Sequence, residues 1–415
     1  MRRRVRRALA FAGAALLLAS VSLAQDAPVT DPAKARAEGE AMNQTYTADD
    51  ALTCVQRSVK FLLDKQNPDG SWGTSTVESL HELSYSNASF YAWKVAGGAI
   101  ATMALMKVDE TPERKIALER AMQYLVSTDR PKRGSDWDID NNWAALYVFI
   151  CLVEAANDAR FQSPDWQKRI RERGVEYFQH LAANQEPKGG WGYYEGPVIG
   201  RHPSWSTSFA TACVIPALVE AKSMGWPIDE KVVKGAVDYV RACALPNGAF
   251  QYDLRTIIPT VVTGENIDNV KGSLGRIQTC NWALRKAGVA NVTDDVARKG
   301  LERFFEHHMF LDAARWKPVP HESYYANAGY FYFFGHYHAA QLINTLPVAE
   351  RDAWHAKLRP QLVKTQMKDG SQADFPGSFY SWTYGTGFAV LALELGLHPE
   401  RFVRGHGIEK AGTNK

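Results

Sequence analysis

The chain has 415 residues, of which 46% are hydrophobic, and its 48 basic and 45 acidic side chains give a formal net charge of +3. This length and composition suffice for a large hydrophobic core. Five arginines lie within the first seven residues, so without residues 1–24 the formal charge becomes 3 − 5 = −2. A nearly neutral protein is not expected to bind nucleic acid, whose phosphates attract basic surfaces.

Residues 1–24 have the composition of an export signal. A basic region opens the chain, an apolar stretch follows, and Ser22-Leu23-Ala24 is a small-x-small cleavage site. The apolar stretch is shorter than the ~20 residues that a membrane span needs. We therefore expect an exported protein, periplasmic or secreted, with a polar linker at 25–45, a folded domain at 46–400 and a C-terminal tail at 401–415.

The cysteines are widely spaced and lie in apolar helical patterns. An odd number of cysteines at such spacings does not indicate a disulfide framework, even in an exported protein. We expect buried free thiols. The residues concerned are Cys54, Cys151, Cys213, Cys243 and Cys280.

A short motif recurs between apolar segments. The sequence QNPDGSW at 66–72 returns as QEPKGGW at 185–191, and partial copies surround Gly134, Gly248, Trp316 and Gly370. Pro and Asp end a helix, Gly supplies the left-handed residue that follows, and Trp can pack on a neighbouring unit. Recurrence at a nearly constant spacing indicates stacked helical units, and we interpret the motif as structural rather than catalytic.

Twelve segments with helical spacing form six pairs. The first helix of each pair carries charges on one side, and the second is apolar nearly all round, as expected for an outer and an inner helix. No segment of any length has the period of a strand. The pattern predicts an all-α (α/α)6 toroid. Its outer helices would be 51–65, 112–127, 166–183, 230–243, 294–308 and 349–365, and its inner helices 88–106, 143–156, 206–222, 274–287, 324–343 and 384–395.

The Gln-x-x-x-Gly-x-Trp motifs between outer and inner helices resemble the repeats of the prenyltransferase/squalene-cyclase superfamily. The resemblance covers about residues 46–397 and implies a toroid with a cavity inside the inner ring. It is less specific for activity, because toroids of this superfamily serve as cyclases, as prenyltransferases and as binding domains.

One acidic stretch resembles the Asp-x-Asp-Asp motif of proton-initiated (class II) terpenoid cyclases, in which the middle Asp protonates an alkene or epoxide. Asp138 matches the first position, Asp140 the middle position, and Asn141 stands in place of the last Asp. The resemblance implies that Asp140 is the catalytic acid and that Asp138 assists it.

From the residues alone, two interpretations of this stretch stay open. In an extended segment Asp136, Asp138 and Asp140 would point the same way, and clustered carboxyls raise one another's pKa, so one could keep its proton. Alternatively, Asp140 or Asn141 simply caps the inner helix that follows.

Other polar and aromatic residues precede the inner helices and are candidates for binding substrate. Aromatic rings there could stabilise a carbocation or stack on a sugar, and they could equally be core. Beside Asp136, Asn141 and Trp143, the candidates are Tyr194, Glu195, His202, Trp205, Glu322, Tyr324, Tyr325, Tyr380 and Trp382.

We predict neither a metal nor a cofactor. The chain has no C-x-x-C motif, and His336 and His338 on one helix would point about 200° apart. The predicted ligand is a small isoprenoid molecule. Peripheral contact with a membrane stays open, and the sequence does not indicate an oligomeric state.

A second class of function also stays open, namely a toroid that binds or cleaves a glycan or peptide in the cell envelope. Export favours this alternative, and the repeat family favours the cyclase. A glycan-cleaving enzyme would need two carboxyls roughly 5–9.5 Å apart. The pairs to compare are Asp138 or Asp140 with Glu195, Glu265 or Glu322.

Overall fold

The computed structural model describes residues 45–78, 85–136, 138–196, 205–254, 266–376 and 379–402. In this part of the chain the secondary structure is helical, with isolated bridges in place of strands. A compact unit begins at Tyr46. The predicted signal segment, most of the linker and most of the tail lie outside the described residues.

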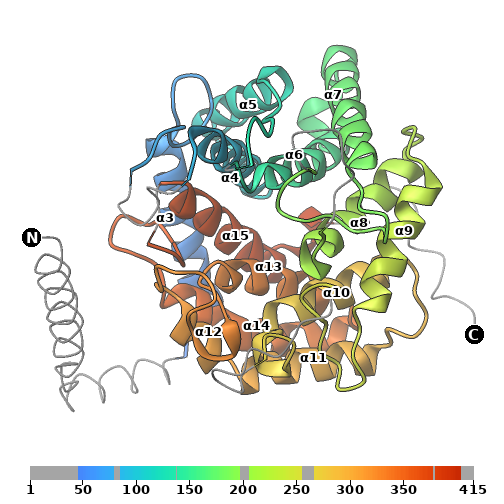
Figure 1. The fold of residues 1–415 in the computed structure, drawn as a ribbon. Coiled ribbons are helices and arrows are strands. Elements are labelled where there is room, and N and C mark those ends of the chain that lie inside the picture. Colours follow the sequence, from blue (N-terminus) through green and yellow to red (C-terminus); the bar gives the residue numbers. More distant parts are fainter. Residues whose placement is uncertain are drawn as a thin grey trace, which may run out of the picture. The chain divides into compact units, whose positions relative to one another are not determined.

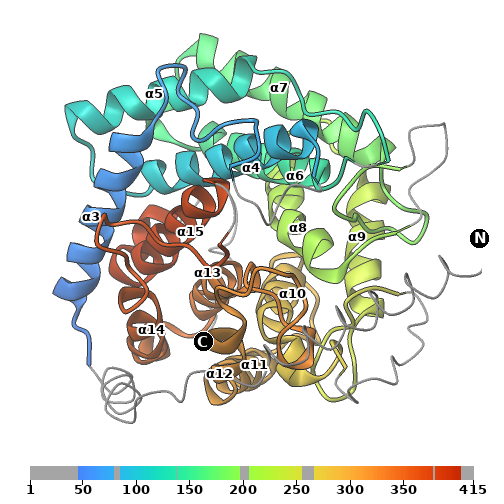
Figure 2. The same cartoon turned by 60° about the vertical axis from the view of Figure 1, so that its left-hand side comes forward.

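Twelve helices of the described chain form two concentric rings (Figures 1 and 2). Successive inner helices contact one another, and the last contacts the first, which closes the ring. The inner helices are α4 (Asn87–Met106), α6 (Asn141–Ala156), α8 (Ser208–Ser223), α10 (Leu274–Lys286), α13 (Phe331–Ile343) and α15 (Tyr380–Leu397). Each packs with an outer helix: α3 (Ala48–Lys65), α5 (Pro112–Ser127), α7 (Pro164–Ala183), α9 (Glu230–Ala242), α11 (Asp294–Glu306) or α14 (Val348–Val363).

Side-chain polarity explains which helices lie inside. Helix α6 is buried along its whole length except at Trp143 and Ala156, whereas α9 buries one face and exposes its charges. Small residues let the inner helices approach closely. A Cβ atom on Gly387 of α15 would lie 2.8 Å from Cγ2 of Ile100 on α4. The predicted (α/α)6 toroid is therefore confirmed.

The repeated motif forms the turn that follows an outer helix. After α3, Nε2 of Gln66 donates to the carbonyl oxygen of Gly70 at 3.2 Å and to that of Ala117 on α5 at 2.8 Å. The indole Nε1 of Trp72 donates to the carbonyl oxygen of Leu62 at 2.8 Å. The amide thus links one outer helix to the next, and the indole satisfies a carbonyl near the helix end.

The second full copy repeats these contacts after α7. Nε2 of Gln185 donates to the carbonyl oxygens of Gly189 at 2.7 Å and Val232 on α9 at 2.9 Å. Nε1 of Trp191 donates to the carbonyl oxygen of Leu181 at 2.8 Å. Both tryptophans are fully buried, so the motif acts as a structural joint.

A third copy closes the outer ring. After α14, Nε2 of Gln366 donates to the carbonyl oxygens of Gly370 at 3.2 Å and of Cys54 on α3 at 2.7 Å. Gln372 stands where the other copies have Trp, and its amide donates to the carbonyl oxygen of Leu362 at 2.8 Å. The amide therefore makes the hydrogen bond that the indole makes elsewhere, which explains how this copy works without Trp.

The glycine of each turn is required by two features of the backbone. Gly70 has φ 90° and Gly189 has φ 103°, which is the left-handed region that favours glycine. A Cβ atom on either would lie 2.2 Å from a backbone carbonyl oxygen of the next outer helix, that of Arg120 or of Gly235. The next helix can approach only because the side chain is absent.

One predicted helix ends slightly early in the structure, and another is broken. The predicted segment 294–308 ends as α11 at Glu306, and the short helix α12 (Met309–Ala314) follows. The predicted segment 324–343 is a 3-10 turn, η4 (Tyr324–Ala326), with α13 beginning only at Phe331. Tyr325 and Ala326 have positive φ values of 55° and 52°, which no helix accommodates. The loop before α13 can therefore reach the cavity.

The motif and its partial copies predict that Trp72, Trp137, Trp191 and Trp316 lie near the same rim of the toroid, and the structure shows this arrangement only in part. Trp72 and Trp191 are equivalent, and Trp137 lies outside the described residues. Trp316 has φ 71° and packs against Trp382, with 5.9 Å between ring centroids, so it does not repeat the buried turn.

The cysteines are all buried and unpaired, as the sequence predicts. Burial raises the pKa of the Cys54 thiol to about 12, which makes it unreactive at neutral pH. Within the described part of the chain, no helix combines the length and the hydropathy needed to cross a membrane.

Candidate functional site

A cavity of about 280 Å³ lies inside the inner ring. Its described wall comes mainly from the first turns of inner helices and the loops before them, and most of it is aromatic. The aromatic lining residues are Tyr85, Trp93, Trp143, Tyr147, Tyr193, Phe209, Tyr330, Phe334, Phe375, Tyr380, Tyr384 and Phe388.

Asp140 provides the sole carboxyl among the described residues that line this cavity. It occupies the position before α6 with φ 66° and ψ 8°, yet its side chain makes no capping hydrogen bond. A left-handed backbone costs a non-glycine residue about 1–2 kcal/mol. The interpretation of Asp140 as a side-chain cap is therefore wrong, and its carboxyl lies at the cavity instead.

The carboxyl of Asp140 is surrounded by aromatic rings. Its Oδ2 accepts a hydrogen bond from Nε1 of Trp93 at 3.1 Å, and the Trp93 ring stacks on Tyr380 with 4.4 Å between centroids. Burial raises the pKa of Asp140 to about 7, against the hydrogen bonds of Trp93 and Trp143, which lower it. Asp140 is partly exposed, but its exposed surface faces the cavity rather than the outside of the protein. The surrounding protein therefore still removes most water from the carboxyl. Near neutral pH a large fraction stays protonated and can act as an acid.

Asp138 behaves differently, although it lies two residues away. Its Oδ2 accepts the backbone N–H groups of Gly134 and Ser135, both at 2.7 Å. Burial acts to raise the pKa of Asp138, but the hydrogen bonds from Ser86, Ser135 and Gly134 outweigh it and hold the pKa below its usual value. Asp138 is an ionised brace within the loop and is not among the described lining residues.

The predicted carboxyl cluster is therefore corrected. Asp136 is exposed and lies 3.5 Å from the guanidinium of Arg133, away from the cavity. Neither Asp136 nor Asp138 raises the pKa of Asp140. The pKa of Asp140 is raised by burial alone, because its two hydrogen bonds lower it.

Asn141 and Glu195 hold the loop that carries Asp140. Nδ2 of Asn141 donates to Oε1 of Glu195 at 2.8 Å, and the backbone N–H of Glu195 donates back to Oδ1 of Asn141 at 3.2 Å. The same Oε1 accepts the backbone N–H of Arg133 at 2.9 Å, and the Arg133 guanidinium lies 4.3 Å from the ring centroid of Tyr194. Asn141, Glu195 and Tyr194 thus act behind the described wall rather than on it.

The other predicted binding residues have three different outcomes. Trp143 and Tyr380 line the cavity. His202 lies outside the described residues. The remaining candidates are not part of the described wall: Trp205 donates to Asp253 at 2.9 Å, Trp382 packs on Trp316, Tyr324 and Glu322 are exposed, and Tyr325 packs on Phe310.

The candidate binding residues chosen from the sequence omit several wall residues, among them Trp93, Tyr193, His321, Tyr330 and Tyr384, although all of these except Trp93 lie in the polar and aromatic stretches before the inner helices. A signal existed on α15, where Tyr380, Tyr384 and Phe388 recur every four residues and so share one face. Tyr330 had no such signal, because it belongs to a segment, 324–343, that was predicted to be helical.

A cluster of hydroxyl groups surrounds His321. The hydroxyl of Tyr330 lies 2.9 Å from Nε2 of His321, and that of Tyr252 lies 3.4 Å from it. Tyr193 contacts the hydroxyls of both Tyr252 and Tyr330, at 3.2 Å for Tyr330. Tyr193, His321 and Tyr330 thus form a polar strip on the described wall, with Tyr252 joined to it from outside the lining.

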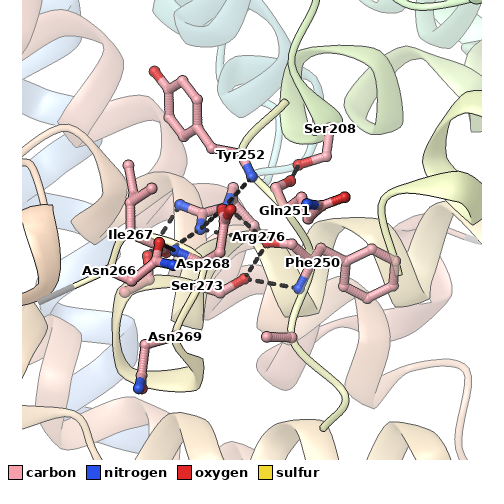
Figure 3. A network of polar contacts seen from close by, with 12 residues as sticks. Ser208, Phe250, Gln251, Tyr252, Asn266, Ile267, Asp268, Asn269, Ser273 and Arg276 are labelled. Carbon is pink, nitrogen blue, oxygen red and sulfur yellow. Dashed lines mark hydrogen bonds and ion pairs between the residues drawn. The ribbon is translucent and has the colours of Figure 1, made fainter. Parts of the chain in front are cut away.

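A buried arginine supports this strip from behind. Arg276 is 1% exposed, and its guanidinium donates to the carbonyl oxygens of Phe250, Ile267 and Gly272, with Asp268 at 3.9 Å (Figure 3). Oδ1 of Asp268 accepts the backbone N–H of Tyr252 at 2.6 Å. The guanidinium N–H groups of Arg276 thus donate to backbone carbonyl oxygens. Arg276 therefore contributes a positive charge and a rigid support, and it does not bind a ligand directly.

A second buried carboxyl reaches the cavity only through a tyrosine. Oδ1 of Asp374 accepts the hydroxyl of Tyr384 at 2.6 Å, and Oδ2 accepts the backbone N–H of Phe333 at 3.1 Å. Burial raises the pKa of Asp374 to about 7, against the hydrogen bonds of Tyr384 and Phe333.

The described residues contain no group of three or more His, Cys, Asp or Glu side chains arranged to hold a metal ion. His308 and His336 do meet, with 2.9 Å between their Nε2 atoms, but their other nitrogens bond Asp312 and the carbonyl oxygen of Tyr332. This pair is a buried hydrogen bond within the wall of the ring.

Comparisons with known sequences support a squalene-cyclase-like toroid. The model of the squalene-hopene cyclase C-terminal domain matches residues 40–146, a segment that includes Asp138 and Asp140. A drimenyl diphosphate synthase from Streptomyces showdoensis is 27% identical over 203 residues, which is 48% of this chain and 32% of the synthase. The match thus spans about a third of that protein's length.

Comparisons with solved structures concern the fold alone. An unsaturated glucuronyl hydrolase from Streptococcus agalactiae matches with a TM-score of 0.53 and 11% identity over 86% of this chain and 94% of the hydrolase. The type II terpene cyclase MstE from Scytonema matches with a TM-score of 0.49 and 15% identity over 86% of this chain and 100% of the cyclase.

Proposed function

We propose that this squalene-cyclase-like toroid is a proton-initiated (class II) terpenoid cyclase and that Asp140 is its acid. The observation that carries the proposal is the environment of Asp140: a carboxyl with a pKa of about 7, on a strained backbone, at an aromatic cavity. Residues held in strained conformations are concentrated at functional sites.

The cavity suits the chemistry of a carbocation. Protonation of an alkene leaves a cation that water would trap, and an aromatic wall excludes water. The π faces of Trp93, Trp143 and the cavity tyrosines can stabilise the cation, each by about 0.5–2 kcal/mol. The hydrogen bond from Trp93 would also stabilise the carboxylate that remains on Asp140 after proton transfer.

The volume of the cavity favours a short substrate. At about 280 Å³ the cavity lies at the lower end of the roughly 300–1,000 Å³ that is usual for ligand pockets. We therefore propose an isoprenoid chain shorter than squalene.

The test compares wild type with Asp140→Asn in D₂O. Asn accepts a left-handed backbone and has nearly the same shape, so folding should be kept. Wild type, incubated with squalene and shorter polyprenyl substrates, should yield a cyclised product with one solvent deuterium, because the Asp140 proton exchanges with solvent. Loss of the acid should reduce turnover by about 10²–10⁴-fold. Equal turnover in the variant, or no product from wild type, would contradict the proposal.

The glycan alternative depends on a different arrangement. Glycoside cleavage needs two carboxyls about 5–9.5 Å apart at the substrate, and the described wall contributes one. Hydrolysis of an oligosaccharide panel by wild type, without any cyclised polyprenyl product, would favour this alternative.

We also propose that the protein is exported through the signal at residues 1–24. The basic and apolar composition of that segment supports it. N-terminal sequencing of protein purified from the native host should begin at Gln25, and an intact Met1 would contradict export by cleavage.

A further inference from the structure

A second strained residue lies on the cavity wall. Five described residues other than glycine have positive φ, and two of them, Asp140 and His321, line the cavity. His321 has φ 65°, close to the 66° of Asp140. Since Asp140 supplies a proton in the proposed function, the other strained residue is a natural place to look for the group that removes one.

The hydrogen bonds of His321 define its tautomer. Nδ1 lies 2.7 Å from the carbonyl oxygen of Ala326, which can only accept, so Nδ1 carries the proton. Nε2 of the neutral ring then holds a lone pair. The hydroxyl of Tyr330 donates to that lone pair at 2.9 Å, and Tyr330 also lines the cavity.

We propose that His321 is the proton acceptor that ends the reaction, with Tyr330 as the relay between substrate and imidazole. This inference rests on the proposed cyclase function. In the last step a carbon beside the cationic centre loses its hydrogen, and the electron pair of that C–H bond becomes the new C=C π bond. The proton passes to Oη of Tyr330 while the proton of Tyr330 passes to Nε2 of His321.

This step balances in atoms and charge. Tyr330 is neutral before and after it, His321 becomes an imidazolium, and Asp140 has become a carboxylate in the first step. Proton exchange with solvent resets both groups. Asp140 itself is poorly placed to take the proton back, because cyclisation moves the cation along the chain away from the carbon first protonated.

The surroundings keep His321 neutral and able to accept a proton. Burial lowers the pKa of His321, the hydrogen bond to Ala326 raises it, and the charge of Arg276 lowers it. The groups that face the ring are the hydroxyls of Tyr252 and Tyr330, with Arg276 behind Tyr252 at 5.3 Å from its ring centroid (Figure 3).

Asp374 is the competing acceptor. It reaches the cavity only through the hydroxyl of Tyr384, which donates to it at 2.6 Å. Asp374 also accepts the backbone N–H of Phe333 and has no atom on the described wall. His321, by contrast, lines the cavity itself, which favours it.

The test measures products rather than rate alone. The variant His321→Asn removes the basic nitrogen, and asparagine tolerates the left-handed backbone at this position. The variant Tyr330→Phe removes the relay hydroxyl and should leave the backbone conformation unchanged. The ratio of alkene to water-quenched alcohol, read by mass spectrometry, should fall about tenfold or more in both variants, as expected for the loss of a positioned base. In wild type the ratio should also fall at acidic pH, well below the usual histidine value of 6.5 because the pKa of His321 is lowered from it, and this dependence should vanish in His321→Asn.

The outcomes separate the two proposals. Asp140-dependent turnover with an unchanged alkene fraction in His321→Asn and Tyr330→Phe overturns the role of His321 and leaves the cyclase standing. A fall in the alkene fraction in Asp374→Asn, without one in the His321 variant, moves the role to Asp374. An inactive wild type overturns both proposals. Independently of turnover, ¹⁵N NMR should show the Nδ1–H tautomer of His321, and an Nε2–H tautomer would overturn the relay.

Discussion

Two regions of the molecule use the same left-handed backbone conformation with different residues. One is the set of turns that follow the outer helices, and the other is the part of the cavity wall that carries Asp140 and His321, here called the rim. In the turns the left-handed residues are glycines such as Gly70 and Gly189, and the next helix packs where a side chain would be. At the rim they are Asp140 and His321, which both line the cavity. Glycine would remove the strain at the rim. Strain is thus avoided where the backbone must pack and retained where a side chain is at the cavity.

The two regions also differ in what their hydrogen bonds do: they hold helices together in the turns, and they surround a functional carboxyl at the rim. Within a turn, the Gln amide and the Trp indole each bond a carbonyl oxygen, so the polar groups serve packing. At the cavity, the carboxyl of Asp140 accepts hydrogen bonds from the side chains of Trp93 and Trp143, and burial raises its pKa. Substitutions in the turns should therefore lower the free energy of unfolding, and replacement of Asp140 by an uncharged residue should raise it.

The largest effect on stability is expected for Gly189→Ala. A left-handed Ala costs about 1–2 kcal/mol, and a Cβ 2.2 Å from the carbonyl oxygen of Gly235 must push α9 away, which costs about 1–3 kcal/mol more. Gly288→Ala is the matched control, because Gly288 has φ 76° and no atom within 4 Å of its Cβ position. Urea unfolding should show a loss of about 3 kcal/mol for Gly189→Ala and about 1 kcal/mol for the control. Equal losses would mean that the close approach does not matter.

A comparable effect of opposite sign is expected for Asp140→Asn. The folded-state pKa of Asp140 is about 7 against 3.8 for the model carboxyl, so between these values the unfolded chain ionises while the folded chain keeps its proton. Wild type should therefore lose roughly 2–4 kcal/mol more than Asp140→Asn as the pH rises from 4 to 7, because Asp374, whose pKa is also raised, titrates in both proteins. The variant should unfold at a higher urea concentration than wild type at pH 7.5, with the gap closing toward pH 4.

Asp138→Asn is the control for this prediction, because the pKa of Asp138 is lowered rather than raised. Its ionised form stabilises the folded state above the usual carboxyl pKa, so Asp138→Asn should be less stable than wild type at pH 7.5. If both Asn variants shift stability in the same direction, the contrast between the two carboxyls is wrong.

The smallest effect concerns the ring closure. Gln366→Ala and Gln66→Ala each remove an amide that bonds two backbone carbonyls, and each should lose about 1–3 kcal/mol by urea unfolding. Both losses should fall in this range, because each side chain also has one further partner: Gln366 donates to Oγ of Ser58 at 2.9 Å, and Oε1 of Gln66 accepts from Arg120 at 2.7 Å. A negligible loss for Gln366→Ala alone would show that the copy without Trp does not link α14 to α3 in the way that the Gln66 copy links α3 to α5.

The sequence by itself determined the architecture of this protein. Helical period, the difference between one-sided and fully apolar helices, and the turn motif predicted the paired rings, because these signals are local and repeat along the chain. The bounds of α5 (Pro112–Ser127) agree with the prediction to the residue. The same local signals placed Asp140 near the start of an inner helix, and the resemblance of its stretch to the Asp-x-Asp-Asp motif singled it out.

Only the tertiary structure decided which side chains surround Asp140. Asp138 and Asp140 look alike in the sequence, but backbone N–H groups surround one carboxylate and aromatic rings from α4 and α15 the other. His321 and Tyr330 meet because the predicted helix 324–343 breaks at residues with positive φ. Burial and pKa depend on atoms contributed by distant repeats, which no local pattern contains, and for that reason the chemistry of the cavity could be read only from the closed ring.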